Sequence, residues 1–235
     1  MYDNSLAAAE KYAAWIDTVI AEASSYSELQ GIEAFERDYL VQALRGEQFW
    51  IRDSGFLTNN PVIYAFSLGM GTYIDREYAP LEERIVAYTD YVSQLPAWLQ
   101  TMQGNLAPPL PAPYVETAHG IFSGMADYFR NTVPGLFADV KDEQLQRRFE
   151  AANTAAADAV EQTARWLDSL RATATDDYAL GEEKFLTMLS ATQGVDISLE
   201  ELKAAGELNL QQNLDTLYAA CAEFAPGAST EDCVL

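Results

Sequence analysis

The sequence contains a single histidine, His119, among its 235 residues. A zinc helix of the H-E-x-x-H type needs two histidines, so this chain cannot contain one. Three-histidine zinc sites and di-iron sites with paired histidines are excluded for the same reason. The scarcity of histidine therefore removes many metal-dependent enzymes from the functions that the chain could perform with its own residues.

Basic residues are also scarce. The chain has 14 Lys and Arg against 36 Asp and Glu, which gives a formal net charge of −22. Such a surface repels phosphate backbones and anionic lipid headgroups, so we expect no nucleic-acid partner. The hydrophobic share of 49% is nevertheless ample for a packed core. The charge is typical of a highly soluble acidic protein, and a cationic partner or substrate is the alternative interpretation.

The sequence lacks the apolar run of about 18 residues that a membrane helix needs. It also lacks a basic segment followed by an apolar stretch at its beginning, which a signal peptide would show. We expect no membrane span. Two localisations stay open: the cytoplasm, or export with a leader that is absent from this chain.

Cysteine occurs only twice, as Cys221 and Cys233. Two cysteines and one distant histidine do not make a zinc site. A disulfide that ties the end of the chain back is conceivable in an oxidising compartment. Two free thiols are the simpler prediction.

What the sequence does contain is helical periodicity. Apolar side chains recur at intervals of three and four in nearly every segment, which predicts an all-α fold, a multi-helix array. Ser27 with Gln30 and Ser198 with Glu201 both fit the capping box that begins a helix. We expect one helical domain over residues 1–235, with an irregular tail at 226–235. The second helix is expected to point six residues inward: Ile32, Phe35, Tyr39, Leu40, Leu44 and Trp50. The four tryptophans are expected in the core: Trp15, Trp50, Trp98 and Trp166.

One segment is not helical in pattern. Residues 104–113 contain four prolines, which favour polyproline geometry. The segment could link two domains. Its apolar residues Leu106 and Leu110 favour instead a strap that lies across a helical surface.

No complete catalytic constellation is visible. Glu116 and His119 have the Glu-x-x-His spacing of ferritin-like di-iron sites, but a second such motif is needed and is absent. There is no Gly-x-Ser-x-Gly turn and no phosphate-binding loop of the Walker type. We therefore assign this chain no catalytic residue, no metal ligand and no cofactor-binding residue.

Several short blocks resemble a known family when taken together and in order. They are SGFLTNNP at 54–61, YAPLEER at 78–84, SQLPAWL at 93–99, NLAPP at 105–109, YVETA at 114–118, YALGEEKF at 178–185 and GVDISLEEL at 194–202. In this order they resemble the bacterial family called domain of unknown function 885, over roughly residues 30 to 220.

The resemblance implies a nearly all-helical protein similar to zinc metallopeptidases of the carboxypeptidase Taq type, a larger gluzincin-like fold of which this chain is one half. Family members carry their H-E-x-x-H helix downstream of the blocks matched here, so zinc is expected only in a full-length member. This chain would then form one wall of a cleft for a peptide substrate and be inactive alone. The family motif makes Tyr178, Gly181 and Glu182 the candidates to border that cleft.

Two classes of function stay open. One is the N-terminal part of a zinc metallopeptidase-like hydrolase, and the other is a stand-alone helical binding module without catalysis. In the first case we expect an apolar surface that the missing C-terminal half would cover. The last helix is the candidate for that surface, and for self-association in its absence, because its leucines span a wide arc.

Overall fold

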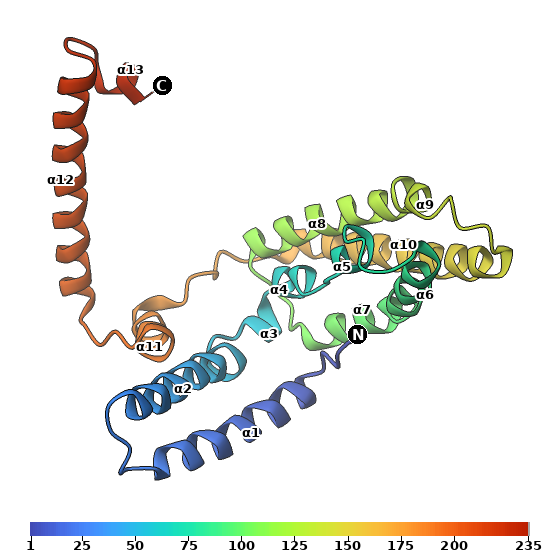
Figure 1. Ribbon diagram of the computed structural model, residues 1–235, viewed down its shortest axis with the longest axis horizontal. Helices are drawn as coiled ribbons and strands as arrows, with labels where there is room; N and C mark the ends of the chain where they lie inside the picture. The colour runs from blue at the N-terminus through green and yellow to red at the C-terminus, as the bar shows by residue number, and fades with distance from the viewer. Residues whose placement is uncertain (235) are drawn as a thin grey trace. The chain divides into compact units, whose positions relative to one another are not determined.

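The computed structural model describes residues 1–234. Over these residues every regular element is a helix, and the only β-type contact is an isolated bridge between Pro111 and Thr175. The predicted all-α, multi-helix fold is therefore confirmed (Figure 1). The chain divides into two compact units, Met1–Leu180 and Gly181–Leu235, where the sequence predicted a single helical domain.

The first unit begins with two long helices, α1 (Leu6–Ser25) and α2 (Ile32–Gln48), which pack against each other. The turn η1 (Phe49–Asp53) continues α2 as a short π-helix. Three short helices follow: α3 (Phe56–Asn59), α4 (Pro61–Phe66) and α5 (Gly71–Ile74). Asn60 begins α4 by accepting a hydrogen bond from the Val62 N–H, and Pro61 fits the first turn because it has no N–H to satisfy.

The remainder of the first unit supplies most of its core. Its helices are α6 (Leu81–Val92), α7 (Leu95–Asn105), α8 (Ala112–Asn131), α9 (Val133–Leu136), α10 (Glu143–Leu170) and the 3-10 turn η2 (Arg171–Thr173). Helix α8 packs along α10, as Figure 1 shows, and α6 and α7 also contact α10. Alanines on α10, among them Ala156 and Ala157, are buried and let the neighbouring backbones approach closely. Large buried side chains fill the remaining space: Tyr88, Phe122, Phe129, Phe137 and Phe149.

The proline-rich segment lies across the first unit as a strap. Leu106 and Leu110 are 6% and 1% exposed, so both are core residues. The Ala112 N–H donates a hydrogen bond of 2.7 Å to the Thr175 carbonyl, and the Thr175 N–H donates one of 3.0 Å to the Leu110 carbonyl. These bonds tie the end of the strap to the segment that follows α10. The geometry is that of a packed strap and not of a linker between domains.

The expectation that α2 points its apolar residues inward is wrong except at Leu44, which is partly buried. Ile32, Phe35 and Tyr39 are 67%, 63% and 68% exposed. Leu40 and Trp50 are also exposed, as is Trp15 on α1. The reason is that the main packing partners of α2 within the first unit are α1 and η1, and both lie away from this face. We refer to Ile32, Phe35 and Tyr39 as the aromatic face of α2.

The expected capping box at Ser27 is also wrong. Helix α2 begins at Ile32 after Gly31, whose φ of 61° lies in the left-handed region that glycine adopts without strain. The Ser27 hydroxyl instead donates to the Glu28 carboxylate.

The second unit contains α11 (Gly181–Gln193), α12 (Leu199–Phe224) and α13 (Thr230–Val234). The capping box at Ser198 is confirmed, because its hydroxyl accepts from the Glu201 N–H and the Glu201 carboxylate accepts from the Ser198 N–H. The tail expected to be irregular contains α13, whose first turn is closed by a bond from the Asp232 N–H to the Ser229 hydroxyl.

The two cysteines form a disulfide, so the prediction of two free thiols is wrong. Helix α12 ends at Phe224, and the chain turns through Pro226 and Gly227 before α13. This turn brings the Cα atoms of Cys221 and Cys233 to 5.8 Å from each other, within the range that a disulfide spans. Sequence spacing alone did not reveal the reversal of direction.

Candidate functional site

The family motif singled out Tyr178, Gly181 and Glu182, and all three are exposed. Tyr178 lies at the end of the first unit, where its main-chain oxygen accepts a hydrogen bond of 3.1 Å from the Tyr114 hydroxyl. Gly181 begins α11 with a φ of 76°, a conformation that a residue with a Cβ adopts only with strain. Glu182 is in the first turn of α11, where the helix dipole favours an acidic side chain. A local structural role thus accounts for Gly181 and Glu182.

His119 is held by a basic neighbour. Its Nδ1 atom lies 3.1 Å from Nη2 of Arg171. Because a guanidinium group only donates hydrogen bonds, this geometry requires Nδ1 to be an unprotonated acceptor. Arg171 also pairs with Asp168 at 3.0 Å. Glu116, the other half of the Glu-x-x-His pattern, is exposed and has no hydrogen bond to His119.

The potential metal ligands of this chain are its His, Cys, Asp and Glu side chains. Within residues 1–234, no three His, Cys, Asp or Glu side chains come together as metal ligands. The two cysteine sulfurs are consumed in the disulfide. The described residues thus bring together no set of zinc ligands of their own.

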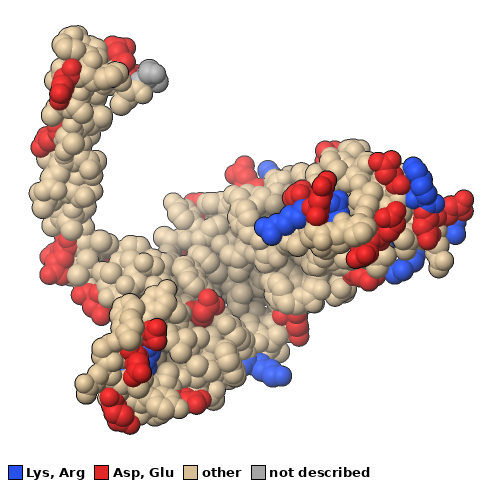
Figure 2. Space-filling model, in the orientation of Figure 1, with Lys and Arg blue, Asp and Glu red and all other residues tan. Residues whose placement is uncertain are grey.

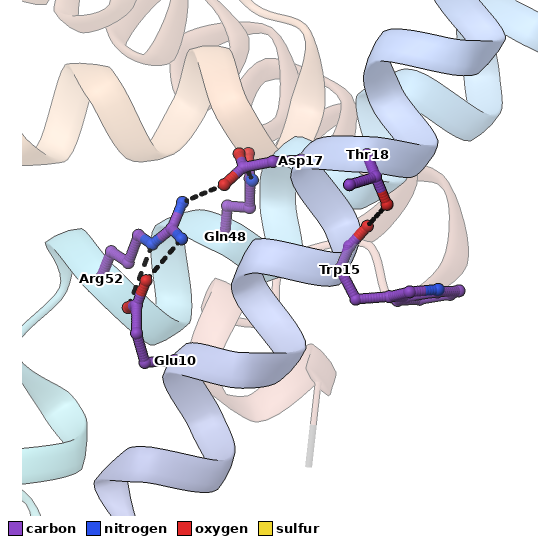
Figure 3. A network of polar contacts seen from close by, with 6 residues as sticks. All are labelled: Glu10, Trp15, Asp17, Thr18, Gln48 and Arg52. Atoms are coloured by element: carbon purple, nitrogen blue, oxygen red, sulfur yellow. Dashed lines mark hydrogen bonds and ion pairs between the residues drawn. The ribbon is translucent and has the colours of Figure 1, made fainter.

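A polar network joins α1 to the π-helical turn η1. Arg52 donates to Glu10 through Nη2 at 2.6 Å and to Asp17 through Nη1 at 3.0 Å. Figure 3 shows the guanidinium between these two carboxylates, with Gln48 also contacting Asp17. The guanidinium holds the pKa of both carboxyl groups below the ordinary range, and the two carboxylates raise the pKa of Arg52.

No local sequence pattern indicates this network, because Arg52 lies 42 and 35 residues from its partners Glu10 and Asp17. The π-helical turn η1 contains Arg52 and sets the direction of its side chain. Single π-turns within helices are often found at functional sites, since the extra residue redirects the side chains that follow. In this chain the turn brings Arg52 against α1.

The exposed apolar surface is the other conspicuous feature. On the aromatic face of α2, the rings of Phe35 and Tyr39 stack with centroids 6.2 Å apart. On α1, Tyr12 and Trp15 stack in the same way at 5.7 Å. In the second unit, Leu208 and Leu210 of α12 are 61% and 59% exposed. Figure 2 shows broad areas without charge between scattered acidic side chains.

A large exposed apolar side chain is common in isolation, but several on one helix face usually mark a surface that contacts something else. No described helix is both long and apolar enough to cross a membrane.

Comparison with known proteins identifies a family for this chain, but the matching family and structure have no described activity. Residues 1–233 match the family described as bacterial protein of unknown function (DUF885). No curated protein matches the chain. Among solved structures, the chain is similar to one described as a candidate lipoprotein of unknown function from Shewanella oneidensis, with a TM-score of 0.78 and 15% identity. The similarity covers 100% of this chain and 45% of that protein, so the chain spans less than half of its length. At this identity the likeness shows a shared fold.

Proposed function

The chain belongs to the DUF885 family of bacterial proteins, and we propose that it is the N-terminal helical part of a larger, metallopeptidase-like hydrolase. In this proposal its helices form one wall of a cleft for a peptide substrate. Tyr178, Gly181 and Glu182 border that cleft. A C-terminal half, carried by the longer protein, packs on the apolar surface that this chain exposes.

The aromatic face of α2 is the observation that supports this proposal most directly. Ile32, Phe35 and Tyr39 are each more than 60% exposed and follow one another at intervals of three and four on one helix. Leaving such a stripe in water forgoes roughly 1.5 to 3 kcal/mol for each large side chain that could be buried. A protein that extends beyond this chain supplies the cover.

The greater length of the similar solved protein supports the same proposal. The Shewanella oneidensis protein contains a similar fold in 45% of its length, so it has more than half its residues outside the shared part. In a longer relative of this chain, that additional part would carry the H-E-x-x-H helix. In this proposal the additional part supplies the zinc ligands, because no three His, Cys, Asp or Glu side chains come together within residues 1–234.

The experiment compares this chain with a longer family protein that contains it. Both are incubated with a peptide library in the presence of zinc, and cleavage is followed by mass spectrometry. We expect cleavage by the longer protein only, and loss of cleavage when glutamine replaces the glutamate of its H-E-x-x-H helix. A longer protein that is inert, or whose cleavage survives that substitution, would contradict the peptidase assignment and favour a non-catalytic binding module.

A further inference from the structure

A cavity of about 430 Å³ opens at the beginning of α1, between this helix, the end of α2, η1, α3 and α4. Its volume lies within the range of sites that hold small molecules. The lining residues belong to the first unit: Tyr2, Asp3, Asn4, Ser5, Ala8, Ala9, Tyr12, Glu47, Ile51, Leu57 and Tyr64. None of the residues discussed above as bordering the peptide cleft is among them.

The charges on this lining are all of one sign. Asp3 and Glu47 are acidic, and none of the lining residues is basic. The backbone N–H of Ser5 donates to the Asp3 carboxylate at 2.9 Å, which lowers the pKa of Asp3 and keeps it ionised. Glu47 makes no hydrogen bond or ion pair with another described residue.

Two basic residues adjoin the lining along the chain, Lys11 beside Tyr12 and Arg52 beside Ile51, and neither lines the cavity itself. Arg52 follows Ile51, which lines the cavity, but its guanidinium pairs with Glu10 and Asp17 (Figure 3). The π-helical turn thus places Ile51 in the lining of the cavity, whereas Arg52 points toward α1 and pairs with its carboxylates. This arrangement leaves Glu47 at the cavity without a neutralising partner from η1.

Three tyrosines complete the lining. Tyr64 is 3% exposed and is fixed by a bond of 2.7 Å from its hydroxyl to the Leu57 carbonyl. Tyr2 packs edge-on against buried Trp98, with centroids 6.1 Å apart, and Tyr12 stacks on Trp15. Aromatic faces carry negative quadrupole potential and attract cations, most of all those that are weakly hydrated. Ile51, Leu57, Ala8 and Ala9 add apolar contact.

We propose that this cavity binds a small organic cation, an ammonium group carried on an apolar body. Tyrosine faces and the two carboxylates complement the positive end, and the aliphatic side chains contact the apolar end. An anion is disfavoured by the carboxylates, and a metal ion is disfavoured because two carboxylates are too few ligands for it. The inference does not depend on the peptidase proposal, because it needs neither a C-terminal half nor zinc.

The test uses isothermal titration of the full chain with 2-phenylethylamine, which is protonated at neutral pH, and with 2-phenylethanol, its neutral counterpart of similar size. We expect the amine to bind about tenfold more tightly than the alcohol, from the sum of cation–π and charge attraction. Glu47→Gln should weaken the amine about threefold or more without affecting the alcohol. Tyr12→Leu, which keeps apolar bulk but removes the ring, should also weaken the amine selectively.

Glu36→Gln is the matched control, because it removes one negative charge from the same helix at a position outside the cavity. Diffuse attraction of the amine to a chain of net charge −22 would respond equally to both glutamine substitutions. Equal effects of Glu47→Gln and Glu36→Gln, or equal affinity for the amine and the alcohol, would overturn the proposal. Circular dichroism on each variant confirms that the helices are intact.

Discussion

The hydroxyl of Tyr88 donates a hydrogen bond of 2.8 Å to the side-chain oxygen of Asn153, in the middle of the core of the first unit. The Asn153 amide in turn donates a bond of 2.7 Å to the main-chain oxygen of Phe129. Asn153 thereby joins α6, α8 and α10. Burial raises the pKa of Tyr88, which keeps its hydroxyl protonated as a donor. The Phe129 carbonyl lies in the last turn of α8, where carbonyl groups lack partners within the helix.

Asn153→Ala should destabilise the first unit by about 2 to 4 kcal/mol, because it leaves a buried hydroxyl and a buried carbonyl without partners. Tyr88→Phe removes only one of the two bonds and should cost about 1 kcal/mol. Urea unfolding followed by circular dichroism measures both. Asn131→Ala, an exposed asparagine on α8 that bonds only to Asp127, is the control and should change stability by less than about 0.5 kcal/mol. Similar costs at the two asparagines would contradict the assigned role of Asn153.

The network around Arg52 should make stability depend on pH in acid. Arg52 lowers the pKa of Glu10 and Asp17 from ordinary values of 4.5 and 3.8. A carboxyl group whose pKa is lower in the folded state stabilises that state above its ordinary pKa, and the effect disappears as pH falls through the lowered pKa. We therefore expect Arg52→Gln to lower the melting temperature at pH 7, and the difference from the unsubstituted chain to vanish by about pH 2.

Arg147→Gln serves as the control for this experiment. Arg147 pairs only with Glu143, one turn away on α10, and both side chains are highly exposed. Exposed pairs of this kind contribute little to stability. A melting temperature that is equally insensitive to both substitutions at pH 7 would show that the contact of Arg52 with α1 is not stabilising.

Local sequence signals predicted the helices well, but not what covers them. The long helix α10 and the cap at Ser198 follow from nearby residues, and the structure has both. Ser27 offers the same Ser-x-x-Glu/Gln pattern, yet Gly31 comes directly after Gln30 and takes a left-handed conformation, so the helix begins later. The aromatic face of α2 has the periodicity of a core helix. Its exposure depends on which elements pack beside it, which periodicity does not encode.

The candidate sites also divide into those that a sequence motif indicates and those that depend on contacts between distant residues. Tyr178, Gly181 and Glu182 came from a motif, and their role at a cleft stays a prediction. The Arg52 network and the cavity beside it depend on contacts between α1 and the end of α2, and no local pattern identifies such contacts. The disulfide likewise required knowledge of the turn between α12 and α13.

The bond between Cys221 and Cys233 should be detectable as a lack of free thiols. Thiol titration of the unfolded, non-reduced chain should find none, and reduction should release two. Because the bond holds α13 to α12, reduction should speed amide hydrogen exchange in residues 225–234, with a loss of about 2 to 3 kcal/mol of local stability. Exchange in α8 and α10 should not change, and they serve as the internal control. Two free thiols in the untreated protein would show that the bond does not form.

The apolar surface should drive association of the isolated chain. Burial of Phe35 and Tyr39 between two copies gains transfer free energy, whereas the net charge of −22 on each copy opposes contact. Salt screens the repulsion and leaves the apolar gain intact, so sedimentation velocity should show a larger associated fraction at 0.5 M salt than at 0.05 M, concentrations between which the Debye length falls from roughly 14 to 4 Å. Phe35→Gln with Tyr39→Gln should shift the chain toward monomer. Leu208→Gln with Leu210→Gln tests the last helix in the same way.

The variant Phe66→Gln distinguishes association through a specific surface from nonspecific association through any exposed apolar side chain. Phe66 is 78% exposed on α4, more than any residue of the aromatic face, but α4 presents no comparable stripe. If exposure alone drove association, Phe66→Gln would reduce it as much as a substitution on α2. If the aromatic face is the surface that a C-terminal half covers, only the α2 or α12 variants should respond. A chain that stays monomeric at every salt concentration would argue against a surface that needs cover, and would favour a stand-alone helical module.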